Sequence, residues 1–242
     1  MNTMMLRTER LFKKYKYRMV VDGISISVRQ GEIVGLLGPN GAGKTTTFYM
    51  TVGLIKPYDG SVYLDDTEIT DWTMYKRARN GIGYLSQEPS IFRGLSVEDN
   101  LLSIAQLLPI SKLEQKEKVN ALLADFGLIK LCGQTSITLS GGEKRRLEIA
   151  RALITDPKFL LLDEPFVGID PITVDDIQKI IKKLKKRGLG ILITDHNVRE
   201  TLEIIDRAYI IYEGKILLEG GAKDLLENPK AREVYLGDNF KM

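Results

Sequence analysis

A glycine-rich loop between an apolar run and a helix constrains this chain more than any other feature. The run Ile33–Leu37 is read as a buried strand, the loop GPNGAGKTT follows at 38–46, and a helix is expected to begin at Lys44. The loop fits the pattern G-x-x-x-x-G-K-[ST], in which backbone N–H groups converge on phosphate oxygens at a helix N-terminus. Lys44 is then expected on the β- and γ-phosphates, and the Thr45 hydroxyl on Mg²⁺. The loop residues expected to bind nucleotide are Gly38, Pro39, Asn40, Gly41, Ala42, Gly43, Lys44, Thr45 and Thr46.

The order of the expected elements indicates the fold class. Residues 4–28 have strand character, with a turn or bulge signal at Asp22-Gly23, and residues 96–152 have helical character. Strands and helices then alternate from Phe159 to Tyr212, which favours a parallel sheet with crossover helices. We therefore expect one α/β unit: a P-loop (RecA-like) core with an antiparallel β layer, built from 1–95 and 156–242, and an inserted α-helical lobe at about 96–155.

Composition excludes several classes of protein. A net charge of +3 is not typical of a dedicated nucleic-acid binder, and no nucleic-acid partner is expected. Cys132 is the only cysteine, which favours a reducing compartment. The N-terminus lacks the apolar segment of a signal peptide, and no run approaches the ~18 apolar residues of a membrane helix. We expect a cytoplasmic chain whose contact with a membrane is made only through partners.

A second motif supplies paired carboxylates. In FLLLDEP, at 159–165, an apolar strand delivers Asp163 and Glu164 to its carboxyl end, where ligands of open α/β sheets bind. Asp163 is expected to hold Mg²⁺, and Glu164 to polarise the attacking water as general base. Adjacent carboxylates alone are commonly a solvated turn, so this interpretation depends on the phosphate loop.

A third motif, LSGGE at 139–143, completes a combination that resembles the ATPase subunits of ABC transporters. The resemblance implies ATP and Mg²⁺ as cofactors and a head-to-tail homodimer. It also implies that Ser140, Gly141 and Gly142 contact the γ-phosphate held by the other subunit's phosphate loop. A serine and two glycines before a helix could by themselves be plain capping, but the surrounding segment TLSGGEKRRLEIARAL resembles the family's signature.

The same resemblance assigns isolated residues that composition would not single out. Gln87 in GIGYLSQEP matches the Q-loop, a γ-phosphate sensor and Mg²⁺ ligand, and His196 in ITDHN matches the switch histidine. Asp170 in Gly168-Ile-Asp170 matches the D-loop at the dimer interface. Tyr15 matches the aromatic residue that stacks on adenine, with Tyr17 as the competing candidate.

Long segments are similar to the ABC ATPases that power lipopolysaccharide export in Gram-negative bacteria. They include GIGYLSQEPSIFRGLSVEDNL, ILITDHNVRETL and the tail VYLGDNFKM, although Ser86 stands where many relatives have proline. The resemblance implies two membrane-spanning permease subunits as partners, on the cytoplasmic face of the inner membrane. A branched-chain amino acid importer and a soluble switch protein remain alternatives.

The segment 90–95 is then expected to line a groove for the membrane partners. An exposed triplet of Ile91, Phe92 and Arg93 would contact them, unless Ile91 and Phe92 belong to the core. The tail residues Tyr235 and Phe240 are expected to dock across the dimer or to fold back on their own chain. The basic run 182–187 is read as a solvated helix end.

Overall fold

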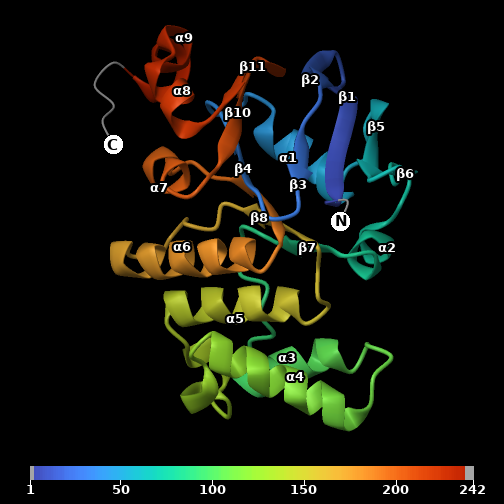
Figure 1. Ribbon diagram of the computed structural model, residues 1–242, viewed down its shortest axis with the longest axis vertical. Helices are drawn as coiled ribbons and strands as arrows, with labels where there is room; N and C mark the ends of the chain where they lie inside the picture. Colours follow the sequence, from blue (N-terminus) through green and yellow to red (C-terminus); the bar gives the residue numbers. More distant parts are fainter. Residues whose placement is uncertain (1–2, 238–242) are drawn as a thin grey trace.

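The computed structural model describes residues 3–237, which form two sheets and a group of helices (Figure 1). One sheet is antiparallel and contains β1 (Met5–Tyr15), β2 (Arg18–Ile24), β3 (Ser27–Arg29), β5 (Asp59–Leu64) and β6 (Thr67–Glu68). The other has the order β11-β10-β4-β9-β8-β7, from β4 (Ile33–Leu37), β7 (Ile82–Leu85), β8 (Phe159–Asp163), β9 (Gly190–Thr194), β10 (Arg207–Tyr212) and β11 (Lys215–Gly220). Neighbouring strands of this sheet are parallel except β11, which is antiparallel to β10.

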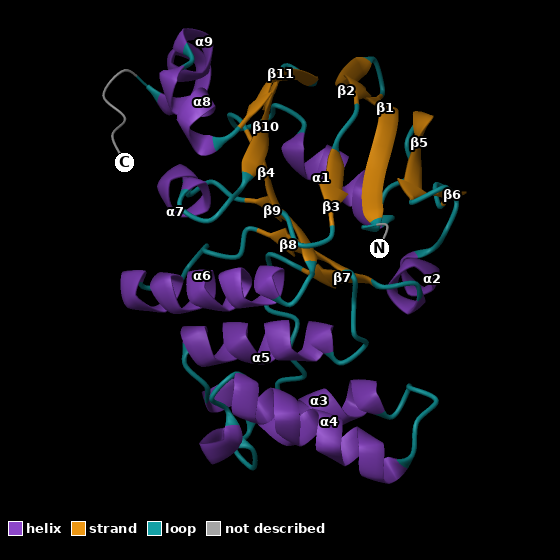
Figure 2. Ribbon diagram, in the orientation of Figure 1, coloured by secondary structure: helices purple, strands orange, loops and turns teal. Residues whose placement is uncertain are grey.

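The helices divide between the sheets and a separate group beyond them (Figure 2). Those nearer the sheets are α1 (Lys44–Val52), α2 (Met74–Arg79), α6 (Pro171–Lys186), α7 (Val198–Leu202), α8 (Ala222–Glu227) and α9 (Pro229–Ala231), with a π-helical turn at Arg232–Leu236. Beyond α6 lie α3 (Val97–Ala105), α4 (Lys112–Asp125) and α5 (Gly141–Leu153). These three helices form the lobe predicted from the sequence, while its exact boundaries stay a prediction.

The predicted fold class is confirmed, with differences in detail. Within the alternating segment from Phe159 to Tyr212, the sequence indicates a helix at 198–205, but this helix ends at Leu202. The chain is drawn onto β4 soon afterwards: Asp206 donates its N–H to the Ile33 carbonyl at 2.9 Å, and its carboxylate accepts the Ile33 N–H at 2.8 Å. The sequence interpretation did not include α2, β11 or α8.

Gly23 forms the bulge that the Asp22-Gly23 pair indicated. In the β1–β2 ladder Leu11 pairs with Ile24 and Phe12 with Asp22, so Gly23 is the extra residue. Its φ of 76° lies in the left-handed region that favours glycine.

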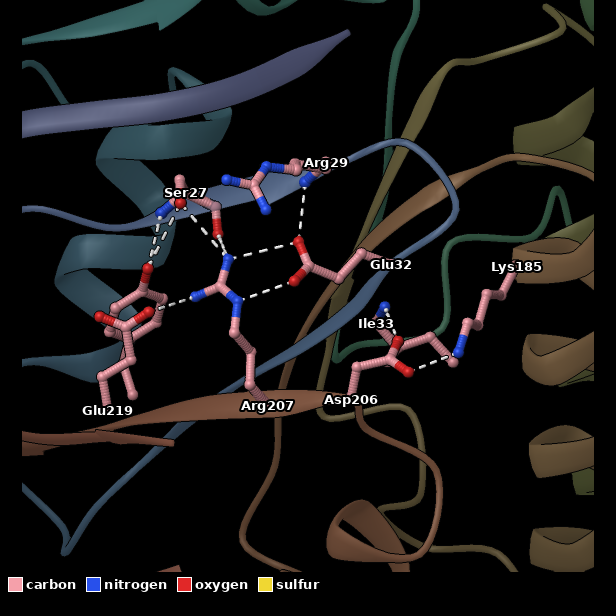
Figure 3. A network of polar contacts seen from close by, with 9 residues as sticks. Ser27, Arg29, Glu32, Ile33, Lys185, Asp206, Arg207 and Glu219 are labelled. Atoms are coloured by element: carbon pink, nitrogen blue, oxygen red, sulfur yellow. Dashed lines mark hydrogen bonds and ion pairs between the residues drawn. The ribbon is translucent and has the colours of Figure 1, made fainter. Parts of the chain in front are cut away.

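A polar network fastens the antiparallel layer to the core sheet (Figure 3). The Arg207 guanidinium on β10 contacts Glu32 at 2.7 Å, Glu219 at 2.9 Å and the Ser27 carbonyl at 2.7 Å. Nearby, the Asp206 carboxylate pairs with Lys185 at the end of α6. Lys183, Lys185 and Arg187 of the basic run 182–187 each pair with a carboxylate of the fold, which the interpretation as a solvated helix end did not include.

Between residues 3 and 237, none of the helices has the length and apolar character that crossing a membrane requires.

Candidate functional site: a nucleotide site at the carboxyl ends of β4, β8 and β9

The phosphate loop connects β4 to α1, and no side chain among the described residues caps the N-terminal N–H groups of α1. Gly43 is the N-cap residue with φ 106°, and no acidic residue lies in the first helical turn. At Gly38 (φ 141°) an added Cβ would stand 2.1 Å from the Ile211 carbonyl oxygen, so only glycine fits. A helix N-terminus of this kind attracts an anion, because its first N–H groups and its dipole both favour negative charge.

The first hairpin packs directly on this loop. A Cβ at Gly43 would lie 2.6 Å from the Val20 carbonyl oxygen on β2, so the two backbones are in close contact. Tyr15 ends β1 on the same hairpin and is 47% exposed, whereas Tyr17 is 97% exposed. The partial burial of Tyr15 favours it over Tyr17 as the adenine platform, although its role stays a prediction.

The Lys44 side chain is buried against the phosphate loop. Its ammonium donates to the carbonyl oxygens of Gly38 at 2.6 Å and Pro39 at 3.0 Å. Burial lowers the pKa of Lys44, and the nearby Glu164 carboxylate acts in the opposite direction. The ammonium is thereby held over the loop rather than extended into solvent.

Asp163 and Glu164 lie where the sequence placed them, at the carboxyl end of β8. Asp163 is 1% exposed, and its Oδ2 has no hydrogen-bond partner within the described part of the chain. Burial raises the pKa of Asp163. Glu164 has a φ of 47°, which few non-glycine residues adopt, and its N–H donates to the Thr194 carbonyl at 2.7 Å.

The structure brings the three predicted catalytic side chains together. The Glu164 carboxylate accepts a hydrogen bond from the Gln87 amide at 2.7 Å through Oε2. Its Oε1 lies 2.6 Å from His196 Nε2. Glu164 is 7% exposed, while Gln87 and His196 are exposed. These side chains come from three loops after β7, β8 and β9, which are neighbours in the sheet.

The residues expected to hold Mg²⁺ offer suitable oxygens. A buried carboxylate oxygen without a partner, as at Asp163, is the kind of atom that a hard cation binds. Thr45 is exposed in the first turn of α1, and Gln87 retains its amide oxygen when its nitrogen donates to Glu164. The donor set therefore fits Mg²⁺.

The signature motif forms the start of α5. Ser140 is the N-cap: its hydroxyl accepts the Glu143 N–H at 3.3 Å, and the Glu143 carboxylate accepts the Ser140 N–H at 2.8 Å. The capping alternative is therefore realised, yet Ser140 and Gly141 remain exposed. At Gly142 a Cβ would lie 2.6 Å from Thr173 on α6, so this glycine permits close helix packing.

Asp170 also has a capping role. Its carboxylate accepts the Thr173 N–H at 3.0 Å and the Thr173 hydroxyl at 2.6 Å, at the N-terminus of α6. Asp170 is exposed, and its place at a dimer interface stays a prediction.

Arg145 was not identified by sequence reasoning. It lies on α5, is 6% exposed, and donates to the carbonyl oxygens of Ser86 at 3.0 Å and of Glu164 and Pro165 at 3.3 Å. It also pairs with the buried Glu148 at 3.1 Å. The available sequence signal was the charged pair at i,i+3 with Glu148. Because such a pair usually lies on the exposed face of a helix, it did not indicate a buried role for Arg145.

Asp195 was missed as well. It is completely buried, and its carboxylate accepts the N–H groups of Phe166 at 3.0 Å and Asn197 at 2.8 Å. Burial raises the pKa of Asp195 to about 6. Asp195 thereby joins the loop that carries Glu164 to the loop that carries His196.

A groove separates the lobe from the core beside this site. It is lined from the core by residues such as Val52, Met74 and Tyr84, and from the lobe by Ile104 and Arg151. Phe92 lies on its rim, 46% exposed, with the Arg151 guanidinium 5.0 Å from its ring centroid.

The expected exposed triplet is wrong for Ile91. Ile91 is 7% exposed and belongs to the main hydrophobic core, because its side chain points inward between exposed neighbours. Phe92 and Arg93 are exposed, as expected.

The C-terminal segment folds back on its own chain as far as it is described. Tyr235 packs against the cluster that contains Leu37, Leu202 and Leu225. Its hydroxyl lies near Gly38 and Asp195, and burial raises the pKa of Tyr235 to about 12. Phe240 lies outside the described residues.

Comparison with known proteins defines the class. The family model described as ABC transporter matches residues 21–167. The chain belongs to this family, as an ATP-hydrolysing, nucleotide-binding subunit.

Individual relatives extend the similarity over the whole chain. Proteins of Acidithiobacillus ferridurans and Escherichia coli (strain K12), both named "Lipopolysaccharide export system ATP-binding protein LptB", are 53% and 51% identical over 238 residues, which covers 98% of this chain and 99% of each relative. A solved ATP-binding cassette of an ABC transporter in its ADP conformation has a TM-score of 0.87 and 32% identity, covering 98% of this chain and 100% of that one. A dimeric cassette in a post-hydrolysis state, bound to ADP and Pi, has a TM-score of 0.78 and 25% identity, covering 90% and 98%.

Proposed function

We propose that this chain is the ATP-hydrolysing subunit of a transporter that extracts lipopolysaccharide from the inner membrane for export towards the outer membrane. The observation that carries the chemistry is the Glu164 carboxylate between Gln87 and His196, at the sheet edge where the phosphate loop begins. The cargo is inferred from relatives about half identical over nearly the full chain.

The residues divide the chemistry between binding and catalysis. The N–H groups of 38–46 and the Lys44 ammonium bind the phosphates, while Thr45, Gln87 and Asp163 would hold Mg²⁺, which neutralises phosphate charge when bound. Glu164 accepts a proton from the attacking water as general base. His196, now on Glu164 Oε1, is placed to orient that carboxylate and to contact the γ-phosphate.

The complete site requires a second copy of the chain. Ser140 and Gly141 are exposed at a helix N-terminus, and Asp170 and Ile172 are exposed nearby, Ile172 by 80%. An exposed N-terminus suits a phosphate held by another subunit. The dimeric cassette with ADP and Pi supports a homodimer. The head-to-tail arrangement, in which each signature faces the partner's phosphate loop, is our proposal from the exposed Ser140 and Gly141.

The membrane partners would dock in the groove between core and lobe. Its mainly apolar lining, with Phe92 and Arg151, suits a helix with apolar and acidic side chains, and the exposed Arg93 follows Phe92 in the chain. Two permease subunits held there would keep the ATPase on the cytoplasmic face of the inner membrane.

Affinity capture tests the assigned cargo. The Glu164→Gln variant, captured from gently solubilised membranes with ATP and Mg²⁺, is expected to bring down two membrane subunits of lipopolysaccharide export, and Phe92→Ala is expected to weaken that capture. Co-purification of an amino acid permease would keep the mechanism and overturn the cargo. Absence of any membrane subunit would contradict the transporter assignment and favour a soluble switch.

A further inference from the structure

Hydrogen bonds join the loop after β8 to the loop after β9. The Glu164 N–H donates to the Thr194 carbonyl at 2.7 Å. Two residues further on, the Phe166 N–H donates to Oδ2 of Asp195 at 3.0 Å. The Phe166 carbonyl accepts a hydrogen bond from the Asn197 side-chain amide at 3.4 Å. Both polar backbone groups of Phe166 are therefore bonded to side chains of the loop after β9.

Asp195 forms the centre of this link. Its carboxylate is completely buried, and burying a carboxylate is costly unless its oxygens accept hydrogen bonds. The two oxygens accept from different loops: Oδ2 from the Phe166 N–H, and Oδ1 from the Asn197 N–H at 2.8 Å. One buried carboxylate thus bridges the backbones of both loops.

Asn197 adds to the bridge instead of capping the helix that follows it. It is the N-cap residue of α7, a position where asparagine commonly accepts a hydrogen bond from the first helical turn. Its side chain makes no such capping bond and donates to Phe166 instead. The loop after β9 therefore uses two side chains to hold the loop after β8.

His196 lies between these two bridging residues in the chain. Its side chain is 48% exposed, and its Nε2 lies 2.6 Å from Oε1 of Glu164. Because packing constrains an exposed side chain little, the position of the imidazole depends on the backbone that carries it. The bridge fixes that backbone relative to Phe166, two residues after Glu164.

We propose that Asp195 is a positioning residue that holds His196 against Glu164. By accepting N–H groups from both loops, its carboxylate sets the separation at which the imidazole meets the carboxylate of the general base. Asp195 itself is buried and acts only through these backbones. This inference rests on the proposed catalytic roles of Glu164 and His196.

NMR of the nucleotide-free full chain tests the contact directly. His196 is the only histidine, so its imidazole signals are unambiguous in the untagged protein. Glu164→Gln removes the charged partner of the ring and defines the signal positions without it. In Asp195→Asn, one N–H donor faces an amide nitrogen that cannot accept it. We therefore expect Asp195→Asn to move the His196 signals most of the way toward their positions in Glu164→Gln.

Steady-state ATP hydrolysis by the same proteins gives a second measurement. Asp195→Asn is expected to lower kcat about tenfold, because a small displacement of a catalytic group is costly. The KM for ATP should stay within about twofold, since the phosphate loop is unchanged.

Asp206→Asn is the matched control. The Asp206 carboxylate also accepts a backbone N–H from another element, that of Ile33 at 2.8 Å. Ile33 begins β4, whereas the phosphate loop follows the other end of that strand. Asp206→Asn should therefore leave the His196 signals in place and kcat within about twofold, even where it lowers the free energy of unfolding.

The outcomes separate this inference from the proposed function. Unmoved His196 signals in Asp195→Asn would overturn the positioning role, and so would an equal fall of kcat in Asp206→Asn, which would indicate a general loosening of the fold. If Glu164→Gln itself leaves the His196 signals in place, the two side chains are not in contact, and the proposed catalytic arrangement fails together with the inference.

Discussion

Glu164 is the proposed general base, and its backbone conformation is unusual. A non-glycine residue at φ 47° costs of order 1–3 kcal/mol, and such strain persists only where surrounding contacts enforce it. Here the Thr194 carbonyl fixes its N–H, while Gln87 and His196 fix its carboxylate. The residue is thus held in one orientation before substrate binds.

Replacing Glu164 by glutamine should separate binding from turnover. The amide keeps the shape of the side chain but cannot accept the proton of the attacking water, so we expect hydrolysis to fall by about 10²- to 10⁴-fold. ATP affinity should stay within about threefold of the original, because we assign phosphate binding to Lys44 and the loop rather than to Glu164. Phosphate release and nucleotide binding are the measurements, and near-normal phosphate release would contradict the general-base role.

At this scale the sequence was informative wherever a residue belongs to a motif with its own mechanism. Lys44, Asp163 and Glu164 could be located from their patterns alone, whereas Gln87 and His196 needed the family resemblance. Arg145 could not be identified, because most of its hydrogen-bond acceptors are backbone carbonyls whose positions depend on tertiary structure.

At the scale of elements, Arg77 ties α2 to α1 and the antiparallel layer. Its side chain is 1% exposed and donates to the carbonyl oxygens of Thr51 at 2.6 Å, Ile69 at 2.8 Å and Trp72 at 3.1 Å. Burial lowers the pKa of Arg77 to about 10. The helix that begins at the phosphate loop is therefore held at its far end by a buried guanidinium.

Arg77→Lys should destabilise the fold by about 2 kcal/mol or more, because one ammonium cannot reach carbonyls on three sides and leaves some unsatisfied. Arg79→Lys, on the same helix but exposed, is the control and should change the free energy of unfolding by less than about 0.5 kcal/mol. Urea unfolding measures both. Equal losses in the two variants would argue against the clamp.

A second link between elements joins the lobe to the core through charge. Asp125, in the last turn of α4, pairs with Arg187 at 2.7 Å and Lys183 at 3.3 Å at the end of α6. The hydrogen bond from Arg187, and then Lys183, lowers the pKa of Asp125.

Asp125→Asn should cost about 0.5 kcal/mol of stability at pH 7, discounted for solvent screening of a partly exposed pair. Because the folded-state pKa lies below the ordinary value of 3.8, the stabilisation is present above that value and is lost as pH falls below it. Urea unfolding of both proteins at pH 7 and near pH 3.5 should show the difference shrinking. A difference that grows on acidification would contradict the ion-pair account, and the exposed Asp66→Asn is the control.

Element types were largely predictable from sequence, because caps and periodicity act locally. Ser96 and Ser111 cap α3 and α4, each through its side-chain hydroxyl. The short α2 was missed, since its stability comes from the buried Arg77 rather than from an apolar stripe. Ile91 was placed outside because adjacent residues cannot be sorted into buried and exposed without knowing the path of the loop.

At the scale of the whole molecule, one chain carries both halves of a nucleotide site. In the proposed mechanism each half pairs with the complementary half of the partner chain. The phosphate loop, Asp163 and Glu164 lie at the sheet edge, while Ser140 and Gly141 are exposed at the start of α5 in the lobe. The sequence alone could indicate both halves but not their separation, which depends on how the lobe packs on the core through Arg145 and Gly142.

The central claim is that two copies close around ATP, and the mass of the Glu164→Gln protein tests it most directly. Light scattering after size-exclusion chromatography should give the monomer mass of 27.3 kDa without nucleotide and about twice that with ATP and Mg²⁺. Ser140→Arg, which places a bulky cation at the exposed signature, should stay monomeric while still binding ATP. A Glu164→Gln protein that binds ATP with Mg²⁺ yet keeps the monomer mass would contradict the shared-site account.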